Sequence, residues 1–234
     1  MLKIIEIIGP PGSGKTFISN ELKKIKVNNK QVFFHSGQKQ TNKFNNLNFF
    51  FKIIINLKVI TTIIIFYLIF SKRLFLKKIY KRNFFFRVGL IIYRDLISIE
   101  ILKKTLTDGK YLLMEPGIIM HFLQDYFYTK RKISKIEIQI FNKIFVKSNF
   151  IVCTYCNHKL LIKRIHSRER GVPQRMSNLN LKEKNNVIKK SIIEIKNYIS
   201  NSSNLNLKII RINTSKKIKN IKKNIMEQII LQSK

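Results

Sequence analysis

Short runs of apolar, mostly β-branched residues alternate along this chain with longer stretches in which apolar residues recur every three to four positions. The short runs are typical of buried parallel strands, and the longer period is typical of helices. Strands are predicted over 3–8, 31–35, 110–115, 149–155 and 207–212. Helices are predicted over 16–26, 88–105, 118–128, 134–145, 159–167, 181–199 and from about 215 onward. Because the two kinds of element alternate, we expect an α/β fold, with about five parallel strands and helices on both faces of the sheet.

One segment departs from this alternation. The chain is strongly apolar over 49–70, but the uninterrupted part, 59–70, is shorter than the roughly 20 residues that a membrane-spanning helix needs. Basic residues then follow among Phe and Leu as far as Arg87. We expect 49–87 to be a hydrophobic, basic helical insertion in a single domain, 1–234. Two alternatives stay open: helices lying on an anionic bilayer surface, and a transmembrane span.

The octet between the first strand and the first helix carries the most specific chemistry, because it satisfies the phosphate-binding P-loop pattern at every fixed position. Its residues are Gly9, Pro10, Pro11, Gly12, Ser13, Gly14, Lys15 and Thr16. In such a loop the backbone N–H groups surround phosphates, the lysine reaches the β and γ phosphates, and the final hydroxyl ligates Mg²⁺. The start of the helix adds partial positive charge to the site. We therefore expect ATP and Mg²⁺ to be bound here.

The chain has only 12 acidic residues, so the search for a catalytic acid is short. Acids on the first strand, the first helix, a turn or the late charged helices are set aside, Glu6 among them. Among the other acids, the serious candidates are Glu115, Asp95 and Asp125. Glu115 closes an apolar strand, which places it at the carboxyl edge of the sheet beside the P-loop. There a carboxylate can orient the water shell of a metal or accept a proton from the substrate, so we predict that Glu115 is the catalytic and metal-site acid.

An arginine-rich segment around a Gly-Val-Pro turn is the second candidate for chemistry. Its arginines are Arg164, Arg168, Arg170 and Arg175. Guanidinium forks bind phosphate oxygens bidentately, and a mobile loop can bring them over a transferring group while it excludes water. We predict a lid over 164–178. Cys153, Cys156 and His158 also have a zinc-like spacing, but one Cys-x-x-Cys pair is a weak signal.

The net charge of +34 attracts anionic partners, whether substrate, RNA or a membrane surface. The lysines are scattered along the chain rather than gathered in a stripe, and the wealth of Ile, Lys, Asn and Phe is typical of AT-rich coding, so we do not expect nucleic acid as the partner. Two cysteines and an N-terminus that enters the first strand without a signal peptide indicate the reducing cytoplasm, with peripheral contact at the inner membrane face as a further alternative.

These residues resemble the P-loop nucleoside and nucleotide kinases, nearest to thymidylate kinase-like proteins. The path from Arg94 and Asp95 through 106–110 to Glu115 is similar to the helix, turn and strand that lead into the catalytic Asp-Arg pair of that group. Glu115 falls on the acid, whereas Pro116 stands in place of the arginine. The segment 160–170 resembles the helix and lid, which implies that Arg164 lies near the adenine and that Arg168 and Arg170 face phosphates. The segment 210–213 resembles the last strand, with Asn213 where an acid is usual.

Within this group, the chain is most similar to an ATP-binding branch often found with surface-polysaccharide gene clusters, whose hydrophobic, arginine-rich helices match 49–87. The resemblance implies a three-layer P-loop NTPase sandwich and an ATP-dependent phosphotransferase whose acceptor need not be a nucleotide. Two alternatives remain: a nucleotide-switch ATPase acting with a membrane or surface-polysaccharide assembly, and, ranked last, a nucleic-acid-binding NTPase.

Overall fold

The computed structural model describes residues 3–27, 30–31, 33–35, 49–74, 82–105, 111–128, 130–146, 148–167, 176–202, 207–215 and 227–228. The chain divides into two compact units. One contains His35–Lys110, and the other contains Lys3–Phe34 with Tyr111–Lys234. The predicted insertion, 49–87, belongs to the first unit. The predicted P-loop and the predicted acid, Glu115, both belong to the second.

A parallel sheet of four strands forms the centre of the second unit. Its strands are β1 (Lys3–Ile8), β5 (Tyr111–Met114), β6 (Phe150–Tyr155) and β7 (Lys208–Asn213). Neighbouring strands pair in the order β5, β1, β6, β7, and all three pairings are parallel. Ile5, for example, pairs with Leu113 on one side and with Phe150 on the other. The predicted α/β class with a parallel sheet is thus confirmed for these four strands.

The region after the first helix is more divided than the sequence pattern predicts. The expected strand 31–35 corresponds to β3 (Lys30–Gln31) and β4 (Phe33–His35), and β3 pairs antiparallel with β2 (Lys26–Val27). The first helix also ends before the predicted residue 26. Its last turn tightens because the N–H groups of Lys24 and Ile25 bond to carbonyls three residues back.

The described residues form seven helices. The second unit contains α1 (Lys15–Lys23), α5 (Ile118–Phe127), α6 (Lys135–Phe145), α7 (His158–His166) and α8 (Leu181–Ser202). The first unit contains α3 (Phe49–Leu74) and α4 (Arg82–Thr105). Most of these bounds lie within a few residues of the predicted ones, although α4 begins six residues earlier. The helix predicted from about 215 falls largely on 216–226 and 229–234, outside the described residues.

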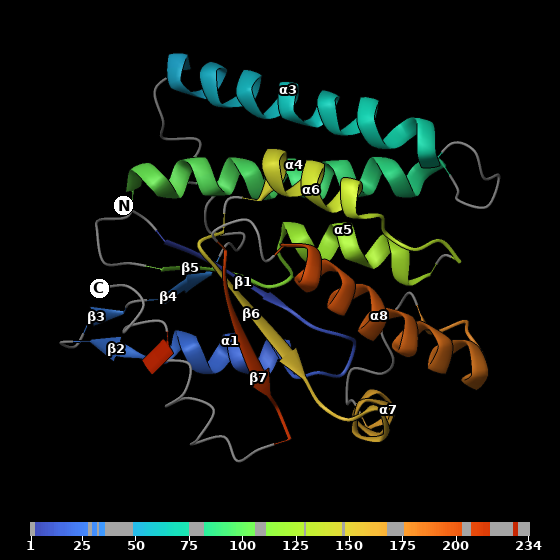
Figure 1. The fold of residues 1–234 in the computed structure, drawn as a ribbon. Coiled ribbons are helices and arrows are strands. Elements are labelled where there is room, and N and C mark those ends of the chain that lie inside the picture. Colours follow the sequence, from blue (N-terminus) through green and yellow to red (C-terminus); the bar gives the residue numbers. More distant parts are fainter. Residues whose placement is uncertain are drawn as a thin grey trace. The chain divides into compact units, whose positions relative to one another are not determined.

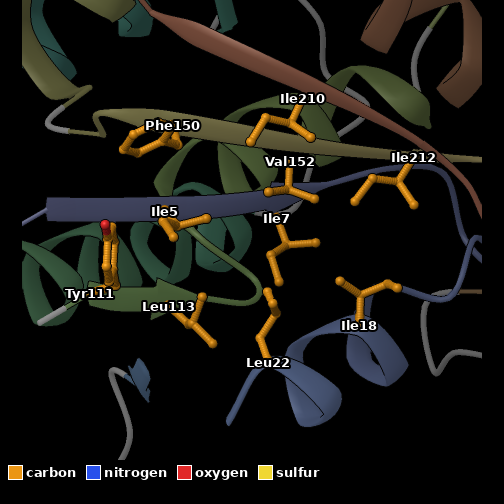
Figure 2. Packing of buried hydrophobic residues seen from close by; sticks show 10 residues of the cluster. All are labelled: Ile5, Ile7, Ile18, Leu22, Tyr111, Leu113, Phe150, Val152, Ile210 and Ile212. Atoms are coloured by element: carbon orange, nitrogen blue, oxygen red, sulfur yellow. The ribbon is translucent and has the colours of Figure 1, made fainter. Parts of the chain in front are cut away.

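Both faces of the sheet are covered, and the strands alternate between them. Ile5 and Ile7 of β1 point to the face on which Ile18 and Leu22 of α1 pack (Figure 2). Glu6, between them, points the other way and accepts a hydrogen bond from the start of α5. Burial on two faces explains why the strands read as nearly continuous apolar runs.

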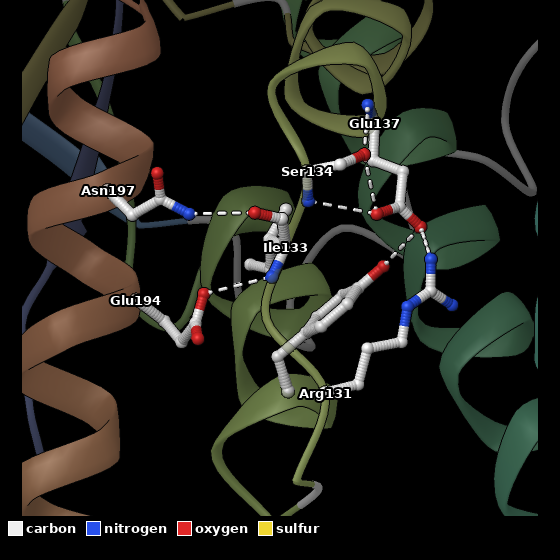
Figure 3. Close-up of polar contacts among 7 residues, drawn as sticks. Arg131, Ile133, Ser134, Glu137, Glu194 and Asn197 are labelled. Atoms are coloured by element: carbon white, nitrogen blue, oxygen red, sulfur yellow. Dashed lines mark hydrogen bonds and ion pairs between the residues drawn. The ribbon is translucent and has the colours of Figure 1, made fainter.

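Helix α8 fixes the link between α5 and α6 through two contacts with Ile133 (Figure 3). Glu194 Oε2 accepts a hydrogen bond from the backbone N–H of Ile133 at 3.1 Å, and Asn197 Nδ2 donates to its carbonyl at 2.8 Å. Beside this link, Glu137 pairs with Arg131 and closes the capping box that begins α6 at Ser134. These contacts satisfy buried backbone groups that would otherwise be costly.

In the first unit α3 and α4 pack against each other (Figure 1). Ile55 and Val59 of α3 are buried, and Tyr93 of α4 donates a hydrogen bond to Asn56 at 2.7 Å. Among the described residues, neither these helices nor those of the second unit combine the length and apolarity needed to cross a bilayer.

Candidate nucleotide site

The predicted P-loop joins β1 to α1 through two glycines in left-handed conformations. Gly12 has a φ of +80°, and Gly14, the residue that precedes α1, has a φ of +84°. A side chain at Gly12 would also place its Cβ 2.8 Å from the carbonyl oxygen of Leu161. Glycine adopts such conformations without steric cost, so the sequence Gly-Ser-Gly permits this turn where bulkier residues would strain it.

Lys15, the first residue of α1, lies across the loop. Its Nζ donates hydrogen bonds to the carbonyl oxygens of Gly9 at 2.8 Å and Pro10 at 3.0 Å. The ammonium group is thus held beside the loop backbone and the start of the helix. The helix dipole adds partial positive charge at the same place. A loop of this geometry can receive a phosphate group. The lysine would then donate to charged phosphate oxygens instead of neutral carbonyl oxygens, and hydrogen bonds to charged acceptors are stronger.

A buried pair of hydroxyls fastens the loop to the sheet. Ser13 Oγ and Thr154 Oγ1 lie 2.7 Å apart, and Thr154 Oγ1 also lies within hydrogen-bond distance of the Ile8 carbonyl, at 3.2 Å. Because Thr154 has a single hydroxyl proton for that carbonyl, Ser13 is the donor to Thr154. Gly9 leaves room for the pair, since a Cβ there would lie 2.2 Å from Thr154 Oγ1.

The predicted metal-site residues meet at the edge of the sheet. Thr16 Oγ1 donates a hydrogen bond to Glu115 Oε1 at 3.2 Å, on the exposed side of the loop. Thr16 stands in the first turn of α1, and Glu115 directly follows β5. A hydroxyl and a carboxylate at this separation offer the hard oxygen ligands that Mg²⁺ prefers.

Arg164 is anchored rather than placed on an extended lid. It lies in the last turn of α7, where Nη2 donates to the Thr214 carbonyl at 2.9 Å and Nη1 donates to the Thr214 hydroxyl at 3.1 Å. Its Nη1 would lie 3.9 Å from a Cβ on Gly14, so this guanidinium stands beside the P-loop. The other predicted arginines, Arg168, Arg170 and Arg175, lie outside the described residues, as does most of the predicted lid.

Glu6, which the sequence pattern led us to exclude as a catalytic acid, is a buried residue of β1. Its Oε1 accepts a hydrogen bond from the Ser148 hydroxyl at 2.6 Å, and its Oε2 accepts one from the backbone N–H of Ile119 at 2.9 Å. The second bond caps α5, whose preceding residue, Gly117, has no side chain to do so. Burial raises the pKa of Glu6 to about 7, because desolvation outweighs both hydrogen bonds.

The zinc-like spacing of Cys153 and Cys156 does not produce a cluster. Within the part of the chain that the structure describes, no three His, Cys, Asp or Glu side chains gather in a way that could hold a metal ion. Cys153 is buried in β6, and burial raises the pKa of its thiol to about 11. A thiol with so high a pKa stays protonated and is a poor metal ligand at neutral pH.

Sequence reasoning missed four polar residues whose hydrogen bonds hold β1, the P-loop, the start of α5 and Arg164 in place. They are Glu6, Ser148, Thr154 and Thr214. Thr214 directly follows the last strand and Thr154 lies near the end of its own, so a search for polar residues near strand ends would have found both. Glu6 carried a different signal, a single charge inside an otherwise apolar run, which is informative because buried charges need partners.

The chain matches no protein-family model, and no curated protein matches its sequence.

Proposed function

We propose that this chain is a P-loop NTPase that binds ATP with Mg²⁺ and transfers a phosphoryl group to a small acceptor. The hydrogen bond between Thr16 and Glu115 carries the proposal. The P-loop pattern singles out Thr16, and the end of an apolar strand singles out Glu115. These are independent reasons, so their meeting at 3.2 Å supports a single site with both roles.

In this proposal the loop amides and Lys15 hold the β and γ phosphates, while Thr16 and Glu115 hold Mg²⁺. The bound metal supplies charge neutralisation on the phosphates. Glu115 would act either as the base that accepts the proton of the acceptor hydroxyl or as an acid that orients the water shell of the metal. In this proposal Arg164 faces the adenine, as the resemblance implies, and its guanidinium is held beside Gly14 by Thr214.

Three arginines outside the described residues complete the proposed machinery. Arg168, Arg170 and Arg175 close over the phosphates, where bidentate forks stabilise the charge that develops during transfer. Pro116 and Asn213 differ from the thymidylate kinase pattern, so we propose an acceptor other than thymidylate. A hydroxyl-bearing sugar or lipid-linked sugar fits the resemblance to proteins encoded with surface-polysaccharide genes.

The fold proposed with this function is the three-layer P-loop NTPase sandwich. Its fifth strand would be β4, which stands next to β5 at the end of the strand order. A cytoplasmic location accompanies the proposal, since ATP is abundant there and both cysteines are free thiols.

ATP turnover tests the proposal directly. Purified protein is assayed for ADP release with Mg²⁺, alone and with separate pools of nucleosides, nucleotides, sugars and lipid-linked sugars. Lys15→Ala removes the phosphate-binding ammonium and should abolish both turnover and nucleotide affinity. Lys23→Ala, on the same helix but away from the loop, is the matched control and should leave both unchanged. Unchanged turnover in Lys15→Ala would refute the proposal.

A nucleotide-switch ATPase is the second candidate, and an exposed apolar face on α3 favours it because a switch must act on an assembly beyond its own site. The same assay separates the two. Stimulation of ADP release by one acceptor pool, with transfer of labelled phosphate to it, indicates the phosphotransferase. Slow turnover that no pool changes indicates the switch.

A further inference from the structure

An apolar surface runs along one side of α3. Side chains of this helix are described over 53–65, and eight residues of that range are exposed. Six of the eight are large and apolar: Ile53, Ile54, Leu57, Ile60, Ile64 and Ile65. Their spacings of one, three and four residues place them on a single helix face. We call these six residues the α3 stripe.

The opposite side of α3 is already used. Ile55 and Val59 are 4% and 3% exposed, and Asn56 accepts the hydrogen bond from Tyr93 of α4. The pairing of α3 with α4 therefore consumes one face and leaves the α3 stripe outside it. Single exposed apolar residues are normal on protein surfaces, but a continuous stripe of six marks a surface with a partner.

Two polar side chains, Thr61 and Lys58, accompany the six apolar ones on the exposed face of α3. Thr61, among the stripe residues, donates its hydroxyl proton to the Leu57 carbonyl at 2.7 Å. Lys58, at the edge of the same face, pairs with Glu100 of α4 at 3.3 Å. Thr61 is therefore satisfied within its own helix. Lys58, whose side chain is 63% exposed, can keep its charged end in water while the neighbouring apolar residues are buried.

Charge indicates what kind of partner this is. The segment 35–110, which contains α3, carries 15 Lys and Arg residues against 3 Asp and Glu residues. Arg94 and Lys103 of α4 are exposed. A second copy of the chain would bring the same positive charge and be repelled, whereas a partner that is both apolar and anionic would match.

We propose that the α3 stripe lies in the interface of an anionic lipid bilayer, with α3 parallel to the membrane plane. A helix of this kind buries its apolar face at the boundary of headgroups and acyl chains, and nearby Lys and Arg residues attract anionic headgroups. The inference goes beyond the proposed nucleotide chemistry and uses none of its residues.

Vesicle flotation of the full chain tests the proposal. The vesicles contain phosphatidylcholine, with or without phosphatidylglycerol. The stripe variant is Ile54→Glu with Leu57→Glu, both 60% exposed. The matched control is Ile136→Glu with Ile193→Glu, which are 59% and 52% exposed on helices of the second unit. Circular dichroism shows that each variant is folded.

The wild type and the control should float with anionic vesicles, and the stripe variant should bind at least about tenfold more weakly. Binding should weaken as salt screens the headgroups. Absence of wild-type binding, or equal binding of both variants, would overturn the proposal. So would a lipid-free dimer that the stripe variant dissociates in sedimentation. ATP turnover in the same samples reports separately on the nucleotide site.

Discussion

The Thr16 hydroxyl and the Glu115 carboxylate lie 3.2 Å apart, although 99 residues separate them along the chain. The register of the sheet explains their meeting. Strand β5 pairs directly with β1, and Met114, the residue before Glu115, lies opposite Glu6. Both strands run in the same direction, so the residue that ends β5 emerges at the edge where β1 enters the P-loop.

Replacement of Glu115 by Gln should slow ATP turnover by about 10²- to 10⁴-fold, because the amide cannot accept a proton or hold a metal as a carboxylate does. ATP affinity should change far less, since the loop amides and Lys15 remain. The measurement is ADP release at saturating ATP, together with equilibrium binding of a fluorescent nucleotide.

The control for this change is Glu183→Gln, another Glu-to-Gln replacement on the surface. Glu183 accepts a hydrogen bond from the backbone of Asn180 at the start of α8, and Gln can fill the same capping position. This variant should turn over ATP like the wild type. Equal rates for the two variants would rule out a catalytic role of Glu115.

Arg164 should matter to both folding and nucleotide binding. Replacement by Met removes both hydrogen bonds to Thr214 and should lower the free energy of unfolding by about 1–2 kcal/mol. If the guanidinium also contacts the base, ATP affinity should fall about tenfold, equivalent to about 1.4 kcal/mol.

Lys163→Met is the adjacent, exposed control for Arg164. Urea denaturation should place it within about 0.5 kcal/mol of the wild type, and its ATP affinity should be unchanged. An Arg164→Met protein that loses stability but binds ATP normally would restrict Arg164 to a structural role.

The sequence pattern predicted structural features that are determined by residues close together in the chain. The apolar run before Gly9 predicted β1, and Glu115 was located because it ends such a run. The P-loop pattern predicted a glycine-rich turn between β1 and α1, and Gly12 and Gly14 adopt left-handed conformations in it. These predictions did not require knowing which helices and strands pack against each other.

The sequence pattern did not predict features that depend on contacts between residues far apart in the chain. Glu6 was set aside as a strand residue because its partners, Ser148 and Ile119, lie 142 and 113 residues away. The anchoring of Arg164 by Thr214 depends on the approach of α7 to the end of β7, which no local signal encodes. The apolar and basic composition over 49–87 likewise predicted a helical insertion, but it could not indicate which face of α3 would remain exposed after packing against α4.

Gly117 should not tolerate a side chain. Its φ of −94° suits any residue, so backbone conformation is not the obstacle. A Cβ there would lie 2.3 Å from Glu6 Oε2, and two hydrogen bonds hold this buried carboxylate in place. Gly117→Ala should therefore lower the free energy of unfolding by about 1–3 kcal/mol in urea denaturation.

A double-mutant cycle isolates this clash. Glu6→Ala removes the carboxylate and is itself destabilising, because Ile119 and Ser148 lose their acceptor. In that background, Gly117→Ala should cost little, which gives a coupling energy of about 1 kcal/mol or more. Additive effects of the two changes would show that Gly117 and Glu6 are not in contact.

The stability contribution of Glu6 should depend on pH. Burial raises its pKa from 4.5 to about 7, whereas the unfolded chain keeps the ordinary value. Between these two values the folded protein binds more protons than the unfolded chain, so the contribution is fully present below pH 4.5 and is lost as the pH rises to about 7. The loss amounts to about 3 kcal/mol.

Glu6→Gln cannot titrate, so its free energy of unfolding relative to the wild type should rise by about that amount between about pH 4.5 and about pH 8 in urea denaturation. A difference between the two proteins that stays constant across this range would show that the carboxyl titrates normally.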